Sequence, residues 1–70
     1  MTEIRAEMVA NVWKILVAEG DPVEEGDPVV ILESMKMEIP VLAEDGGVIT
    51  KLQVAEGDVI QEGDLIAVIE

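Results

Sequence analysis

The sequence predicts an all-β fold, a small antiparallel barrel or sandwich of about eight short strands in two sheets of about four. The first observation behind this is the tripeptide Glu-Gly-Asp, which occurs four times. Each copy combines a Gly that can adopt positive φ with an Asp that can bond its own backbone, as turns require. The second is that the segments between these turns are short and rich in Val, Ile and Leu, as in buried strands.

The second half of the chain repeats the first. Residues 14–33 align with residues 51–70 at a shift of 37, and ten of the twenty positions are identical. A solenoid needs about three or more stacked units to build a continuous core, so two copies favour two halves packed face to face about a quasi-two-fold axis. We therefore expect a single domain over 1–70 with repeat halves at about 1–34 and 38–70.

The elements follow in order from local patterns. Apolar and polar residues mostly alternate over Ile4–Ala10, which predicts a half-buried strand. Short aliphatic runs predict strands at Val12–Val17, around Val29–Leu32 within Pro28–Ser34, and at Met37–Leu42. Pro22 and Pro28 each follow a Gly-Asp turn, where they can start or flank a strand without removing a central hydrogen bond.

The charge balance narrows the classes of function. The chain has 16 Asp and Glu against 4 Lys and Arg, for a formal charge of -12. Phosphate backbones and anionic lipids would be repelled, so we expect no nucleic-acid or membrane partner, and a basic protein surface fits better. No apolar run exceeds five residues and no basic segment opens the chain, so we expect a cytoplasmic protein without a spanning helix or secretory signal.

One lysine stands outside the repeat. Lys14 and Lys51 are repeat mates and are read as solvated strand residues, whereas Lys36 lies in the connector and has no mate. The strands Pro28–Ser34 and Met37–Leu42 can pair only through a two-residue turn at Met35-Lys36, which puts Lys36 at a hairpin tip. Such turns prefer Asn-Gly or Asp-Gly, and every other turn here contains Gly. This departure from the local rule indicates that the side chains at the tip are needed.

Catalysis and metal binding have little support. There is no His or Cys, and the only serine, Ser34, has no base available in sequence, so no catalytic residue is predicted and the chain is not expected to be an enzyme. An EF-hand register starting at Asp21 places Gly26 correctly, but Leu32 stands where a bidentate Glu is required. No metal site is predicted, and the acidic turns are read as solvated surface.

The residues around Lys36 resemble those of the biotinyl/lipoyl attachment domain family, above all its stand-alone biotin carboxyl carrier proteins. The family pattern is Glu-Ala-Met-Lys-Met between two halves that each carry a Gly-Asp-x-Val-x-x-Gly signature. This chain has Glu33-Ser34-Met35-Lys36-Met37, with Gly20–Gly26 before and Gly57–Gly63 after. The resemblance covers nearly all 70 residues, and it departs from the pattern at Ser34, a small-for-small exchange.

The resemblance implies a flattened barrel of two four-stranded sheets, the barrel-sandwich hybrid, with Lys36 at its exposed hairpin. It implies covalent biotin on Lys36, attached by a biotin protein ligase, with Glu33, Ser34, Met35, Met37 and Glu38 as the surrounding recognition residues. Biotin carboxylase and carboxyltransferase subunits would be the partners, and the carrier would be a monomer in isolation.

Two other functions remain open. A lipoyl carrier shares the fold and the tip lysine, but it typically has Asp before the lysine and Ala after it, whereas Met flanks Lys36 on both sides. Lipoate is therefore a possible cofactor, alone or beside biotin. An unmodified acidic adaptor that binds a basic protein would have no need for an amine at position 36, so Lys36→Arg would be silent.

Overall fold

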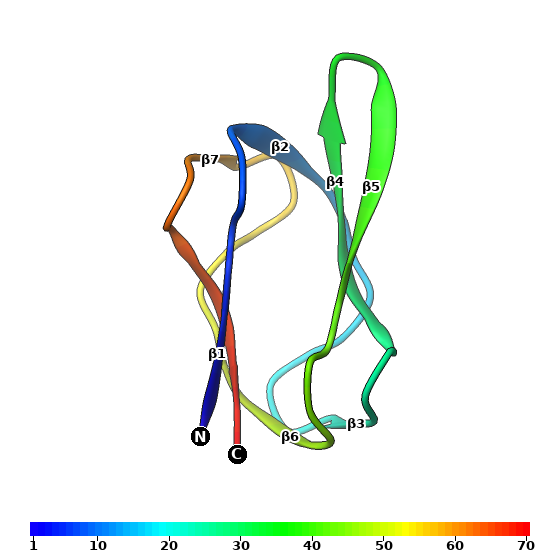
Figure 1. The fold of residues 1–70 in the computed structure, drawn as a ribbon, viewed down its shortest axis with the longest axis vertical. Helices are drawn as coiled ribbons and strands as arrows, with labels where there is room; N and C mark the ends of the chain where they lie inside the picture. The colour runs from blue at the N-terminus through cyan, green and yellow to red at the C-terminus, as the bar shows by residue number, and fades with distance from the viewer.

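The computed structural model describes residues 1–70, which form eight strands and no helix. The strands make two four-stranded antiparallel sheets, in the orders β1-β8-β6-β3 and β5-β4-β2-β7 (Figure 1), as the sequence predicts. The strands are β1 Thr2–Arg5, β2 Ala10–Ile15, β3 Pro22–Val23, β4 Pro28–Ser34, β5 Met37–Leu42, β6 Gly47–Leu52, β7 Val59–Ile60 and β8 Leu65–Ile69. No helix is present that could cross a membrane.

The core between the sheets is entirely apolar. Sixteen residues are buried and none of them is polar or charged. Folding therefore removes no ionisable side chain from water. The largest fully buried side chains are Val12, Val29, Val30, Ile49, Ile66 and Ile69. Dense packing of branched aliphatic residues from both halves therefore stabilises a chain that has no disulfide to help it.

The prediction of one strand over Ile4–Ala10 is wrong. The burial alternation continues to Ala6, but the Ala6 N–H donates to the Asp64 carbonyl and the Ala6 carbonyl accepts from the Gly63 N–H, both at 2.9 Å. Gly63 and Asp64 belong to the Glu-Gly-Asp turn before β8 and not to a strand. After Ala6 the chain leaves the first sheet, and it enters the second at β2. The two residues before β2, Met8 and Val9, are exposed, which ends the alternation.

The strand predicted over Val12–Val17 also has different limits. It is β2, which begins two residues earlier at Ala10 and ends at Ile15. Pairing with β4 is interrupted by a bulge between Val12 and Lys14, and an equivalent bulge separates Ile49 from Lys51 in β6. An extra residue on one strand shifts the pleat, so a simple period-two pattern misplaces the end of the strand. Both lysines are exposed strand residues, as predicted.

The sequence repeat recurs in the hydrogen bonds. Gly20 donates to the Ile49 carbonyl at 2.7 Å, and its repeat mate Gly57 donates to the Val12 carbonyl at 2.8 Å. The Asp21 carboxylate accepts the Ala18 N–H, and that of the mate, Asp58, accepts the N–H three residues before it, both at 2.9 Å. The glycine bonds run from each half to the other and the aspartate bonds repeat within each half, so the two halves are related by a quasi-two-fold axis.

The four Glu-Gly-Asp glycines all have positive φ, between 91° and 96°, as predicted for these turns. Gly20 and Gly57 are matched at 96° and 93°, and a Cβ at either would meet no atom within 4 Å. We expect Gly20→Val and Gly57→Val each to lower the free energy of unfolding by about 1–3 kcal/mol, through backbone strain alone. Denaturant unfolding followed by Trp13 fluorescence measures both, and clearly unequal losses would contradict the quasi-symmetry.

The hairpin of β4 and β5 forms one end of an elongated molecule. The principal extents are 31 × 17 × 17 Å, and the hairpin extends beyond the neighbouring strands along the long axis (Figure 1). Both chain termini lie at the opposite end (Figure 1). The fold therefore presents one tight turn far from the two ends of the chain.

Candidate functional site

The register of β4 and β5 creates a two-residue turn at the end of the molecule. Glu33 pairs with Glu38 and Ser34 pairs with Met37, which leaves only Met35 and Lys36 between the strands. Both strands have the bounds that the sequence predicts, Pro28–Ser34 and Met37–Leu42. The two paired strands thus fix the position of the tip, because only two residues connect them.

The backbone of the turn confirms the expected departure from ordinary turn chemistry. Met35 has φ 52° and Lys36 has φ 66°, and they are the only residues other than Gly with positive φ. Two-residue hairpin turns of this type need positive φ at both central positions, which residues with a Cβ adopt only at a cost of about 1 kcal/mol or more each. This conformational cost is present only at the turn that contains Lys36.

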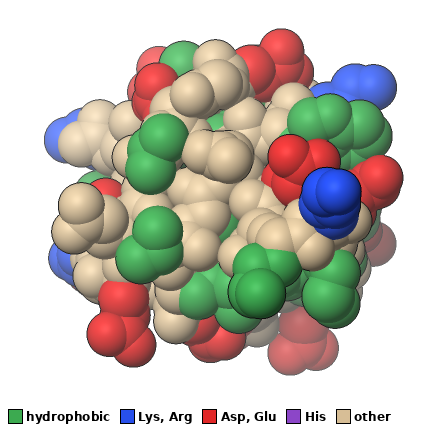
Figure 2. Space-filling model, turned by 90° about the horizontal axis from the view of Figure 1, so that it is seen from above, with side chains coloured by type: hydrophobic (Ala, Val, Ile, Leu, Met, Phe, Trp, Pro, Cys, Tyr) green, Lys and Arg blue, Asp and Glu red, His purple; other side chains and the backbone are tan.

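Lys36 is exposed and unpaired. The only ion pair in the structure joins Arg5 to Glu3 at 2.8 Å, and no hydrogen bond involves the Lys36 side chain. Met35 and Met37, on either side, are 93% and 64% exposed. Viewed from this end, the surface shows Lys or Arg side chains among acidic and hydrophobic ones (Figure 2). The amine is therefore free to react, and thioether side chains surround its attachment point.

The two faces of the hairpin differ. Leu32 is buried and Ile39 packs on the core, so the next pair toward the tip, Glu33 and Glu38, points to the opposite, outer face. Two carboxylates lie directly across from each other there, an arrangement that is unfavourable for the hairpin itself. The outer face beside Lys36 is thus strongly acidic.

The inner face of the tip touches the loop that precedes β2. The Ser34 hydroxyl donates to the Val9 carbonyl at 3.5 Å, the outer limit for a hydrogen bond. This contact could not be predicted from the sequence, because the loop contains no turn motif and lies 25 residues before Ser34 in the chain.

The Ser34 hydroxyl contributes little by this geometry. We expect Ser34→Ala to change the free energy of unfolding by less than about 0.5 kcal/mol, because the bond is long and the side chain is only half-buried. Thermal unfolding of the two proteins, side by side, tests this. A loss of more than about 1 kcal/mol would show that the contact holds the hairpin against the loop.

Comparison with known proteins decides the family. The model of the biotin/lipoyl family, described as "Biotin-requiring enzyme", matches residues 2–69. The chain belongs to this family.

The similarity to individual proteins extends over most of the chain. A Mycobacterium leprae protein named "Biotinylated protein TB7.3 homolog" is 60% identical over 48 residues, which are 69% of this chain and 68% of that protein. A Bacillus subtilis protein named "Biotin/lipoyl attachment protein" is 48% identical over 46 residues, 66% of this chain and 63% of that one. The crystal structure of Kluyveromyces lactis urea carboxylase superposes with a TM-score of 0.91 at 40% identity, covering 99% of this chain but 6% of that one.

The structure brings together all six residues that the biotin/lipoyl resemblance singled out. They occupy consecutive positions at the end of β4, the turn and the start of β5, namely Glu33, Ser34, Met35, Lys36, Met37 and Glu38. No group of three or more His, Cys, Asp or Glu side chains is arranged to hold a metal ion. The chemistry that this site offers is that of one accessible primary amine.

Proposed function

We propose that this chain is a biotin carboxyl carrier, with biotin joined in amide linkage to the Lys36 amine. The observation that carries the proposal is the two-residue turn, which projects an unpaired amine from the end of the molecule at the expense of positive φ at two residues with side chains. A solvated lysine has no need of such a position, whereas a lysine that must enter the active site of another protein does.

The residues of the tip fit the covalent group. The exposed Lys36 amine acts as a nucleophile toward an activated acyl group such as biotinyl-adenylate, so that a C–N bond forms, adenylate leaves and the lysine charge is lost. Met35 and Met37 provide flexible apolar surface on both sides of the attachment point. When bound, biotin supplies a ureido nitrogen that can accept a carboxyl group and release it.

The chain acts as a substrate for other enzymes and not as a catalyst. It positions the attached group, and docking to a partner raises the local concentration of that group to about the millimolar range. Because the tip lies at one end of the 31 Å axis, the end of the domain can approach a partner while the body remains outside. A biotin protein ligase, a biotin carboxylase and a carboxyltransferase are the proposed partners, which the similarity to urea carboxylase supports.

Lipoate is the second candidate cofactor. One relative is named for both biotin and lipoyl attachment, which supports a tip able to accept either group. The lysine amine would form the same kind of amide with lipoate. Met on both sides of Lys36 favours biotin, so we expect lipoylation to be minor.

Intact-mass spectrometry with peptide mapping tests both proposals. The purified protein is incubated with ATP and either biotin plus a biotin protein ligase or lipoate plus a lipoate ligase, each ligase being checked on a known carrier. We expect one biotinyl group per chain, on the peptide that contains Lys36, and little lipoylation. Comparable modification by both would overturn the biotin preference, and no biotinylation of the folded protein would overturn the carrier assignment.

A further inference from the structure

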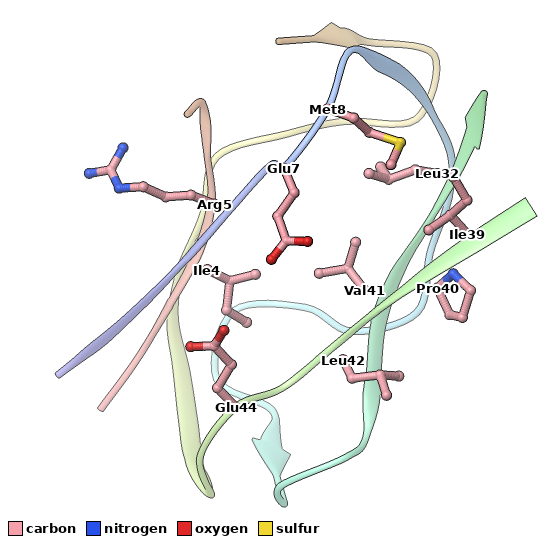
Figure 3. A pocket seen from close by; sticks show the side chains of 10 residues that line it. All are labelled: Ile4, Arg5, Glu7, Met8, Leu32, Ile39, Pro40, Val41, Leu42 and Glu44. Carbon is pink, nitrogen blue, oxygen red and sulfur yellow. The ribbon is translucent and has the colours of Figure 1, made fainter. Parts of the chain in front are cut away.

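A cavity of about 160 Å³ lies between the free edges of the two sheets. Side chains of β1, the following loop and β5 surround it (Figure 3). Its lining is Ile4, Arg5, Glu7, Met8, Leu32, Ile39, Pro40, Val41, Leu42 and Glu44. It is the one cavity in the molecule and is separate from the hairpin turn that carries Lys36.

The two halves of the repeat build this cavity jointly. Ile4 and Val41 are repeat mates, and so are Glu7 and Glu44, at the shift of 37. The cavity thus lies where β1 and β5, themselves related by the repeat, form the outer strands of the two sheets. Its apolar wall is completed by Leu32, which is 2% exposed.

Two unpaired carboxylates border the apolar wall. Glu7 and Glu44 are exposed, form no ion pair and accept no hydrogen bond through their side chains. Both point toward the space between β1 and β5, whereas the Arg5 side chain points away (Figure 3). Arg5 is occupied by Glu3 at 2.8 Å and by the Gly63 carbonyl at 2.8 Å, so it does not neutralise them. The cavity therefore combines an apolar interior with a negative entrance.

We infer that this cavity receives an arginine side chain of a partner protein. A cavity of about 150 Å³ accommodates a benzene-sized group, so the wall can take the apolar stem while the planar guanidinium meets the two carboxylates. A charge of -12 steers basic protein surfaces toward the molecule. The cavity also reaches Met8 and Ile39, close to the hairpin end, so a protein docked over that end can fill it. The inference does not depend on modification of Lys36.

Titrations followed by two-dimensional amide NMR test the inference with two cationic probes. Benzamidine combines a benzene-sized body with an amidinium, and benzyl alcohol is its neutral control. The peptide acetyl-Gly-Arg-Gly-amide carries the side chain itself, and the same peptide with citrulline is neutral. We expect saturable shifts for both cationic probes at residues of the lining, and weaker or absent shifts for the neutral ones.

A pair of variants with matched charge separates the cavity from general attraction. Glu7→Gln/Glu44→Gln should weaken binding of both cationic probes about tenfold, because two charge-assisted contacts are lost. Glu25→Gln/Glu62→Gln removes the same charge from two exposed repeat mates in the Glu-Gly-Asp turns and should leave binding within about twofold. Retained Trp13 fluorescence and thermal unfolding show that both variants fold.

Three results would overturn the inference. The first is equal shifts with charged and neutral probes, which would mean that the carboxylates take no part. The second is equal weakening in both double variants, which would mean attraction by overall charge. The third is binding of benzamidine without binding of the arginine peptide, which would make the cavity a site for small cations and not for a partner protein.

Discussion

Replacing Lys36 by arginine is expected to reduce biotinylation from one group per chain to none. Arginine keeps the positive charge and a long flexible stem, but its guanidinium is not a nucleophile at neutral pH and forms no stable amide. The side chain is exposed and unpaired, so the free energy of unfolding should change by less than about 0.5 kcal/mol. Intact mass after incubation with ligase, biotin and ATP measures the first effect, and thermal unfolding measures the second.

The other two lysines provide the controls. Lys14→Arg and Lys51→Arg change repeat mates in exposed strand positions, and both variants should be biotinylated as fully as the parent. If the chain were an unmodified adaptor that acts through its charge, Lys36→Arg would leave its function unchanged. A Lys36→Arg chain that still supports carboxylation in cells would refute the carrier function.

Gly47→Ala is expected to lower the free energy of unfolding by about 3 kcal/mol, the upper end of the loss expected for Gly20→Val and Gly57→Val. A Cβ at Gly47 would lie 2.5 Å from the Glu70 carbonyl oxygen and 2.8 Å from the Ile69 Cγ2 atom. Relief would require Glu70 to move, and its backbone makes two hydrogen bonds with Val48, at 2.9 and 3.0 Å. Denaturant unfolding followed by Trp13 fluorescence gives the loss directly.

The adjacent glycine is a matched control. A Cβ at Gly46 would meet the Val23 carbonyl at 3.6 Å and the Glu24 Cα at 3.8 Å, which are ordinary contacts, and its φ is not positive. Gly46→Ala should therefore change the free energy of unfolding by less than about 1 kcal/mol, in either direction. Equal effects at the two positions would show that Gly47 tolerates a side chain and that the end of β8 is free to shift.

The hairpin and the turns could be predicted from the sequence because their causes are local. The absence of Gly at Met35-Lys36 stood out against four turns that have it, and the positive φ values followed from turn geometry. The break between β1 and β2 could not be predicted in this way. It depends on the bonds of Ala6 to Gly63 and Asp64, which come from the other half of the chain.

The same distinction applies to the site and its surroundings. Lys36 and its neighbours are contiguous, so a short motif was sufficient to single them out as the candidate site. The Ser34–Val9 contact and the cavity arise where separate strands approach each other, and neither has a motif. A side chain at Gly47 is costly because Glu70 and Ile69 approach it from β8, and no local pattern shows that approach.

The pairing at the termini makes them the counterpart of the hairpin. Thr2 pairs with Ile69 as their repeat mates Ile39 and Leu32 pair beside the tip. The chain is therefore a nearly closed ring of strands in which one turn is left open. A four-residue linker from Glu70 to Met1, the counterpart of Ser34–Met37, would close that ring. A lysine at its third position would give a carrier with two attachment lysines, one at each end of the 31 Å axis.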